Sequence, residues 1–224
     1  MESSSSWSLV LDSLWPLAEG MIFGTIPLTA ISFVLGLIIA LAIALARISR
    51  SKFLSGFAAT YISIIRGTPL LLQLFIIFFG LPSLGVVLDP WPSAILAFSL
   101  NVGGYAAELI RAAILSVPKG QWEAAATIGL NRSQSLRFVI LPQAARVAVP
   151  PLSNTLIALV KDTSLASAVL VTEILRKAQE IAAPTFQFFL LYSVAAVYYW
   201  IVSQALTLVQ GRLEKRLNRK VARQ

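Results

Sequence analysis

The sequence predicts an all-α integral membrane protein with five transmembrane helices and a separate helical segment in the cytoplasm. Composition is the first reason: 57% of the 224 residues are hydrophobic and 12% are charged, and this charged share is about half of what a soluble domain carries. The second reason is that apolar residues gather in long runs, which suit helices because helices satisfy their own backbone hydrogen bonds in a bilayer. The runs do not alternate between apolar and polar residues as barrel strands do.

Five stretches of the sequence have the length of a membrane-spanning helix, which takes roughly 17–25 apolar residues. They are 21–46, 54–80, 93–116, 148–172 and 186–210. We therefore expect one transmembrane domain over residues 21–210 and a basic cytoplasmic tail over 211–224. No strong internal repeat is visible, which weakens the case for a transporter built from two inverted halves.

Residues 1–20 are expected to form an extracytoplasmic segment with a short helix in the membrane interface. One face of that helix would gather Trp7, Val10, Leu11, Leu14 and Trp15. The segment lacks the basic start of a secretory signal, so we do not expect it to be cleaved. The alternative for residues 1–6 is a disordered polar tail.

Basic residues are concentrated in alternate links between the spans. The first link, the third link and the tail hold Arg47, Arg50, Lys52, Lys119, Arg132, Arg137, Arg146, Arg212, Lys215, Arg216, Arg219, Lys220 and Arg223. The second link has no basic residue and carries Asp89. The positive-inside rule then places the N-terminus outside and the C-terminus in the cytoplasm. Topology and lipid headgroups explain the net charge of +8, so we expect no nucleic-acid partner.

The cytoplasmic stretch 119–146 turns amphipathic between two apolar spans. Helical spacing puts mostly small residues on one face, where another backbone could approach closely; these are Trp122, Ala125, Ala126, Gly129 and Leu130. Gly129 is expected to serve either this close approach or helix termination, and Asn131 is a good N-cap residue. A second short helix would follow, and Pro142 would end or kink it. The alternative is a solvated linker that lies on headgroups.

The same stretch resembles the EAA loop of ABC importer permeases. The match comprises Glu123, Ala124, Ala125, Gly129, Val139, Leu141 and Pro142, with Val139 where isoleucine is usual. Further stretches resemble the branch of the family for polar amino acids such as histidine, glutamine, arginine and cystine. They are IIRGTPLLLQL (64–74), LNVGGYAAELIRAAILSVPKGQWEAA (100–125), LPQAARVAVPPLSN (141–154) and LVKDTSLAS (159–167). The resemblance covers residues 20–215.

This resemblance implies a type I ABC importer permease of the bacterial cytoplasmic membrane. The EAA loop would be a coupling helix that docks on a dimer of ATPase subunits, which would bind ATP and Mg. A second permease copy or close paralogue and an extracytoplasmic substrate-binding protein would complete the importer. The sequence has no GxxxxGK[ST] loop, so we expect no enzyme activity and no cofactor in this chain.

Several ionisable and polar residues fall inside predicted spans. A charge near a helix centre costs roughly 2.5–3.5 kcal/mol unless it is paired or faces water. The third span carries one polar stripe, Asn101, Tyr105, Glu108 and Arg111. The fourth span carries Lys161, Asp162, Thr163 and Ser164 in a row, which indicates a local break in the helix. Arg66 belongs to a further interruption, Arg66-Gly67-Thr68-Pro69, in the second span.

These residues could form a site for a zwitterionic amino acid at the middle of the membrane. Asp162 or Glu108 could receive the ammonium group, while Arg111, Arg66 or Lys161 could receive the carboxylate. The alternative is structural pairing, of Glu108 with Arg111 and of Asp162 with Lys161 or Arg66. The family resemblance implies pathway residues in the third and fourth spans, which favours Asn101, Tyr105, Glu108, Asp162 and Ser164.

A second function class is an ATP-independent, ion-coupled transporter or channel for a small polar solute. The EAA spacing counts against it, because a self-contained carrier needs no docking helix. An intramembrane enzyme is a poor fit, since the sequence contains no His and no Cys to supply a common base, nucleophile or metal ligand.

Overall fold

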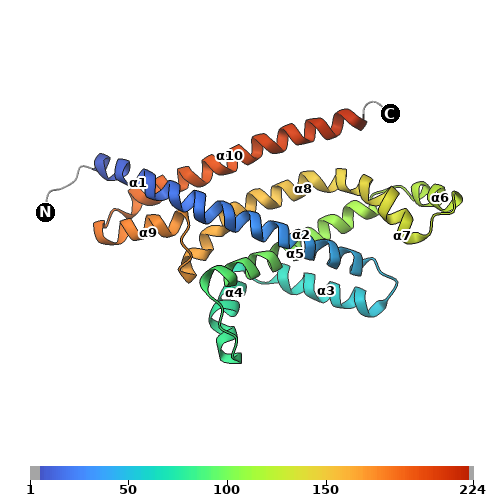
Figure 1. Cartoon of the computed structure of the whole chain (residues 1–224), viewed down its shortest axis with the longest axis horizontal. Coiled ribbons are helices and arrows are strands. Elements are labelled where there is room, and N and C mark those ends of the chain that lie inside the picture. The colour runs from blue at the N-terminus through green and yellow to red at the C-terminus, as the bar shows by residue number, and fades with distance from the viewer. Residues whose placement is uncertain (1–5, 222–224) are drawn as a thin grey trace. The chain divides into compact units, whose positions relative to one another are not determined.

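The computed structural model describes the backbone of residues 6–221 and the side chains of residues 7–216. This part of the chain is almost entirely helical and contains no β-strand, which confirms the predicted all-α class. The helices can be followed in chain order in Figure 1.

Five α-helices lie in each half of the described chain. The N-terminal half contains α1 (Ser6–Gly20), α2 (Ile26–Arg47), α3 (Lys52–Gly67), α4 (Leu70–Phe75) and α5 (Pro90–Leu115). The C-terminal half contains α6 (Lys119–Thr127), α7 (Arg132–Ser135), α8 (Leu141–Asp162), α9 (Ile174–Thr185) and α10 (Phe188–Val221). Turns of π-helix cover Met21–Thr25, Ile76–Gly80 and Leu136–Ile140, and 3₁₀-helices cover Leu81–Leu84 and Thr163–Val169.

Three helical runs of the described chain are long and apolar enough to cross a membrane alone: Trp7–Arg47, Pro90–Leu115 and Phe188–Arg216. Two bent pairs pass the same test together, Lys52–Gly67 with Leu70–Leu84 and Arg132–Val169 with Ile174–Thr185. If each bent pair is one span, the described residues contain five spans, the number that the sequence predicts. The first run, Trp7–Arg47, includes α1, so α1 continues into the first span without a helix end. The expected position of α1 in the membrane interface stays a prediction.

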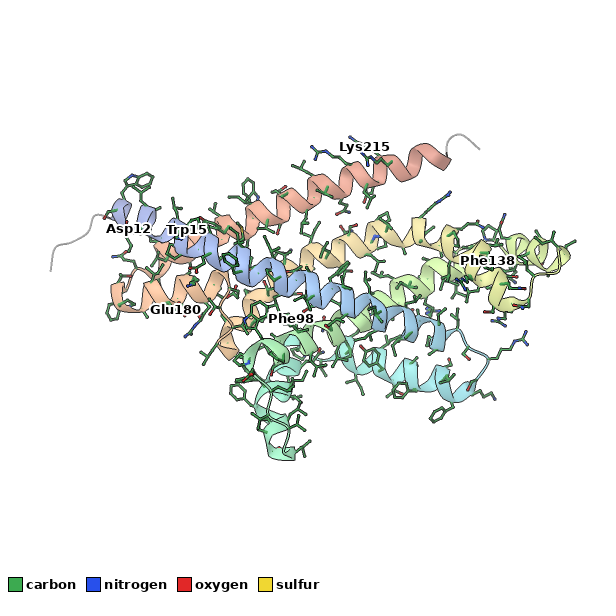
Figure 2. The ribbon with its side chains drawn as sticks, viewed as in Figure 1. Asp12, Trp15, Phe98, Phe138, Glu180 and Lys215 are labelled. Carbon is green, nitrogen blue, oxygen red and sulfur yellow. The ribbon has the colours of Figure 1, made fainter. Side chains whose placement is uncertain are left out.

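The chain divides into two compact units. The first unit comprises residues up to 34, 69–99 and 156–208, and the second comprises 35–68, 100–155 and the residues from 209 on. In the first unit, a buried apolar cluster joins α1, α9 and α10; its members are Leu17, Ile174, Ala178 and Ala195. Trp15, labelled on α1 in Figure 2, has 72% of its surface exposed.

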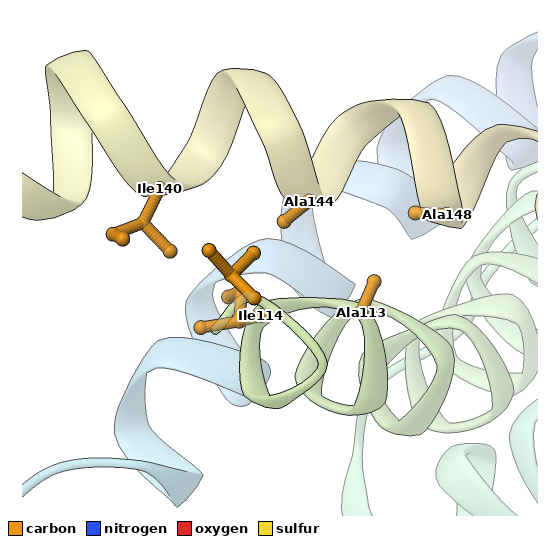
Figure 3. Close-up of a cluster of buried hydrophobic side chains, with 6 residues drawn as sticks. Ala113, Ile114, Ile140, Ala144 and Ala148 are labelled. Carbon is orange, nitrogen blue, oxygen red and sulfur yellow. The ribbon is translucent and has the colours of Figure 1, made fainter. Parts of the chain in front are cut away.

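The core of the second unit lies where α5 meets the start of α8. Ile140, Ala144 and Ala148 recur every four residues and therefore share one helical face. They pack on Ala113 and Ile114 of α5, and Figure 3 shows the Ile114 and Ile140 side chains pointing toward each other. The small alanines let the two helices approach closely. Ile140 and Ala144 belong to the stretch 119–146, so this stretch is packed into the core.

Candidate functional site

The α6 helix ends at a glycine in a conformation that other residues rarely adopt. Gly129 has φ of 81°, and its N–H donates to the Ala126 carbonyl at 2.9 Å, while the Leu130 N–H donates to the Ala125 carbonyl at 3.1 Å. A Cβ at this glycine would meet nothing within 4 Å. The glycine is therefore required by backbone geometry, so it terminates the helix and does not serve close packing.

The next helix begins at the predicted N-cap. Asn131 caps α7 through a reciprocal capping box: the Gln134 N–H donates to Asn131 Oδ1 at 3.0 Å, and the Asn131 N–H donates to Gln134 Oε1 at 2.9 Å. Two backbone donors that would otherwise lack partners at a helix start are thereby satisfied.

Of the two outcomes expected at Pro142, an end or a kink of the helix, the end is wrong. The helix passes from α7 through the π-turn Leu136–Ile140 into α8, and Pro142 is the second residue of α8. The Leu141 N–H donates to the Leu136 carbonyl, five residues back. This wide turn interrupts the regular hydrogen-bond ladder just before the proline, so the missing proline N–H and the ring are accommodated without ending the helix.

The small-residue face of α6 packs on this chain's own core. Ala125 is buried, and Trp122 lies against the cluster that contains Ile114 and Ile140. The expectation that this whole face is free for a partner backbone therefore needs correction at Ala125 and Trp122, whereas Ala126 and Gly129 remain exposed. The other side of α6 is open: Glu123 and Ala124 are exposed.

The remaining members of the EAA match lie just after α6, in the π-turn Leu136–Ile140 and at the start of α8. Leu141 is half-buried against the core of the second unit, whereas Pro142 is exposed. Val139 is half-buried against the same core, and Gly129, just after α6, is exposed. The sequence match thus separates into anchoring positions, Ala125 and Leu141, and outward positions that a partner could reach.

The polar stripe of α5 contains a paired acid and base. Arg111 Nε donates to both carboxylate oxygens of Glu108, at 3.0 and 3.1 Å, and its terminal nitrogen also contacts this carboxylate. The side chains remain 29–30% exposed. This bidentate arrangement is the structural pairing that the sequence left open, and it offsets much of the cost of placing either charge in a span.

One residue of this polar stripe, Tyr105, also contacts Arg66 of α3. The guanidinium carbon of Arg66 lies 5.5 Å from the centroid of the Tyr105 ring, a distance at which a cation is attracted to a ring face. Asn101 is half-buried one turn before Tyr105. Gly103 and Gly104 allow this approach of α3, because a Cβ on Gly104 would lie 2.5 Å from Ile65 Cγ2. Five predicted pathway residues thus belong to the second unit.

The other four pathway residues belong to the first unit, at the predicted break in the fourth span. The α-helix gives way at Asp162 to the 3₁₀-helix Thr163–Val169, as the sequence indicated. The hydroxyl groups of Thr163 and Ser164 donate to the carbonyls of Val160 and Lys161, at 2.6 and 2.7 Å. These bonds satisfy two backbone carbonyls at the point where the α-helical hydrogen-bond pattern changes to the 3₁₀ pattern.

Asp162 is half-buried, while its neighbour Lys161 is exposed. The two side chains form no salt bridge with each other within the described residues. Structural pairing of Asp162 with Lys161 is therefore absent, in contrast to Glu108 and Arg111.

The predicted interruption of the second span is also present. α3 ends at Gly67, and Thr68 and Pro69 are extended, with ψ of 146° and 136°, before α4 begins. Proline disfavours helical geometry in the residue before it, which explains why the break falls here.

Glu173 is a buried acid that the sequence did not single out. Its carboxylate accepts the N–H groups of Leu175 and Arg176, at 2.9 and 2.7 Å, and the hydroxyl of Tyr199. It is 0% exposed. In the sequence, Glu173 is only one acid beside Arg176 and Lys177, and nothing in that pattern distinguishes a buried acid from an exposed one.

Comparison with known proteins agrees with this geometry. Residues 36–219 match the model of the family described as "Binding-protein-dependent transport system inner membrane component". The L-cystine transport system permease protein TcyB of Bacillus subtilis (strain 168) is 58% identical over 97% of this chain and 93% of its own. The glutamine transport system permease protein GlnP of Escherichia coli (strain K12) is 37% identical over 92% of this chain and 96% of its own.

Solved structures share the fold. A crystal structure of an amino acid ABC transporter with histidines contains a chain 31% identical to this one, with a TM-score of 0.88 over 96% of this chain and 99% of that chain. The MetNI methionine ABC transporter in an inward-facing conformation gives a TM-score of 0.71 at 21% identity, over 97% and 99% of the two chains. The resemblance to polar amino-acid permeases that the sequence motifs indicated is confirmed.

Proposed function

The chain belongs to the family of binding-protein-dependent transport system inner membrane components, and on this premise we propose that it is the transmembrane subunit of an ATP-driven importer for a polar amino acid. Cystine is the substrate we favour, because the relative at 58% identity is an L-cystine transport permease. The structural observation that best supports the proposal is α6, a short helix with one face anchored on the core and the opposite face open.

Such a helix suits the transmission of force. Trp122 fixes α6 to the core formed by α5 and α8, and Ala125 is buried, whereas Glu123 and Ala124 are exposed and could meet an ATPase subunit. A push on the open face would move the core as a rigid body, since packed interiors deform little. ATP and Mg would be bound by the ATPase dimer.

Each unit, taken by itself, has polar residues that could bind one charged group of an amino acid: Asp162 in the first unit, and Arg66 with the Glu108–Arg111 pair in the second. Asp162 has no salt-bridge partner among the described residues and could receive an ammonium group. Arg66 could receive a carboxylate, and the Glu108–Arg111 pair could exchange one partner for the substrate. A second permease copy and an extracytoplasmic binding protein would complete the importer, with the N-terminus outside and the C-terminus in the cytoplasm. A channel or ion-coupled carrier is the competing function.

Uptake into proteoliposomes tests the proposal. We expect labelled cystine to enter only when the permease is reconstituted with a separate ATPase chain, internal ATP and an external binding protein. Uptake driven by a proton or sodium gradient without the ATPase would support the competing function. ATP-dependent uptake of another amino acid in preference to cystine would support the importer function and reject cystine as its substrate.

Glu123→Lys is expected to weaken association with the ATPase at least tenfold. The exposed carboxylate lies on the open side of α6, so its replacement reverses a charge at the proposed contact without disturbing the core. Copurification of the ATPase measures the effect. Glu180→Lys, an equal charge change on α9, serves as the control, and equal copurification of both variants would reject the docking role.

Asp162→Asn is expected to lower uptake at least tenfold while the complex still assembles. The substitution keeps the size of the side chain and removes the charge that would hold an ammonium group. Uptake and ATPase copurification are measured together, with Asp89→Asn in the second link as the matched control. Normal uptake by the Asp162 variant would remove this residue from the proposed pathway.

A further inference from the structure

Three basic side chains from three separate segments line one pocket in the second unit. Arg50 follows α2, Lys119 begins α6 and Arg132 begins α7. The pocket has a volume of ≈ 520 Å³. A second pocket of ≈ 350 Å³ is also lined by Arg50 and Arg132, with Trp122 common to both. Because the two pockets share Arg50, Trp122 and Arg132, they are adjacent, and together we call them the basic pocket.

The positive charge of the basic pocket is not neutralised within the described chain. No Asp or Glu lines either part of it, and none of its three cations takes part in a salt bridge among the described residues. All three side chains are exposed. Cations brought together from distant segments without an acid raise the local potential and attract an anion.

The rest of the lining is apolar. Ile114, Leu115 and Val117, at and just beyond the end of α5, contribute with Leu130 and Trp122. Leu115 is 60% exposed, so an apolar group could reach the pocket from the side of the span. A ligand with a phosphate next to an apolar chain would satisfy both parts of this lining.

The position of the basic pocket favours a lipid over a partner protein. Arg50 belongs to the first link and Lys119 to the third, both of which the positive-inside rule places at the cytoplasmic headgroups. Within α6, Lys119, Trp122 and Ala126 share the face that lines the pocket, and Ala124 lies on the other side of the helix. Of the proposed ATPase contact, Ala124 therefore faces away from the basic pocket, whereas Glu123, four residues after Lys119, lies beside the pocket.

We propose that the basic pocket binds the headgroup phosphate of an anionic phospholipid from the cytoplasmic leaflet. Arg50 and Arg132 would donate to the phosphate oxygens, as guanidinium groups do, and Trp122 would cover the glycerol region. The bound headgroup would join the α2–α3 link to the α6–α7 segment and so brace the coupling helix. This proposal rests on the cytoplasmic orientation given under the proposed function.

The test uses the full-length permease in nanodiscs of phosphatidylcholine alone or with phosphatidylglycerol. Native mass spectrometry counts retained phosphatidylglycerol, and thermal unfolding measures protection. We expect the wild type to retain phosphatidylglycerol and to unfold several degrees higher in its presence. The double variant Arg50→Gln/Arg132→Gln should bind this lipid at least tenfold more weakly. The control Lys52→Gln/Arg137→Gln removes the same charge outside the pocket and should behave as the wild type.

Three results would overturn the proposal. One is equal retention of phosphatidylglycerol by the double variant and its control. Another is equal protection of the wild type by inorganic phosphate in phosphatidylcholine discs, which would identify a free phosphate as the ligand. The third is loss of ATPase copurification by the double variant in phosphatidylcholine alone, which would assign the basic pocket to an acidic partner segment. Lipid binding is read without transport, so failure of the uptake assay leaves this test intact.

Discussion

Gly24→Ala is expected to destabilise the first unit by about 3 kcal/mol, the upper end of the usual range for overpacking. A Cβ at Gly24 would lie 2.3 Å from the Thr172 carbonyl oxygen and 2.7 Å from the Glu173 Cα. Both atoms are backbone, so no side-chain rotation can relieve the overlap. The first helix would have to move away from the segment that leads into α9.

Thermal unfolding in detergent measures this effect. Gly56→Ala is the matched control, because a Cβ at Gly56 in α3 meets nothing within 4 Å. Alanine is the better helix former, so the control should unfold at the wild-type temperature or slightly above it. If the two alanine variants unfold at the same temperature, the close contact at Gly24 is not required for stability.

Glu173→Ala is also expected to destabilise the protein, with a loss of about 2–4 kcal/mol in the free energy of unfolding. The side chain caps α9 through two backbone N–H groups, and removal of such a cap costs about 0.5–2 kcal/mol. The Tyr199 hydroxyl also donates to this carboxylate, and a buried donor without a partner costs a further 1–3 kcal/mol or so.

Two comparisons separate the acceptor role from simple loss of volume. Glu173→Gln keeps one acceptor oxygen and should be less harmful than alanine. Glu180→Ala removes an exposed acid of the same helix, paired with Arg176 at 3.1 Å, and an exposed pair contributes less than about 1 kcal/mol. Unfolding temperatures that are equal for the alanine variants of Glu173 and Glu180 would contradict the buried cap.

The two changes act on one structural feature. Gly20 and Gly24 leave room for the backbone at residues 172–173, and Glu173 then fixes the start of α9. The 3₁₀-helix Thr163–Val169, which follows Asp162, ends only a few residues earlier. The packing of the first helix against residues 172–173 thus fixes the end of the segment that begins at Asp162, a proposed pathway residue.

The sequence by itself determined the all-α class and singled out the EAA segment, whose coupling role stays a prediction. Apolar length is a local property, so a run such as 93–116 predicts its helix, Pro90–Leu115, to within a few residues. Proline and glycine act on their own backbone, and a capping side chain acts on the backbone beside it, which is why the break at Pro69 and the cap at Asn131 were predictable. The EAA spacing is likewise a local pattern, and it identified Glu123 and its neighbours.

Tertiary structure alone decided which surfaces are occupied. Helical periodicity groups Trp122 with Ala125, but it does not say whether that face meets this chain or another. The burial of Glu173 and the convergence of Arg50 with Arg132 depend on contacts between segments distant in the sequence. Burial and charge environment are set by neighbours in space, and only the fold supplies these.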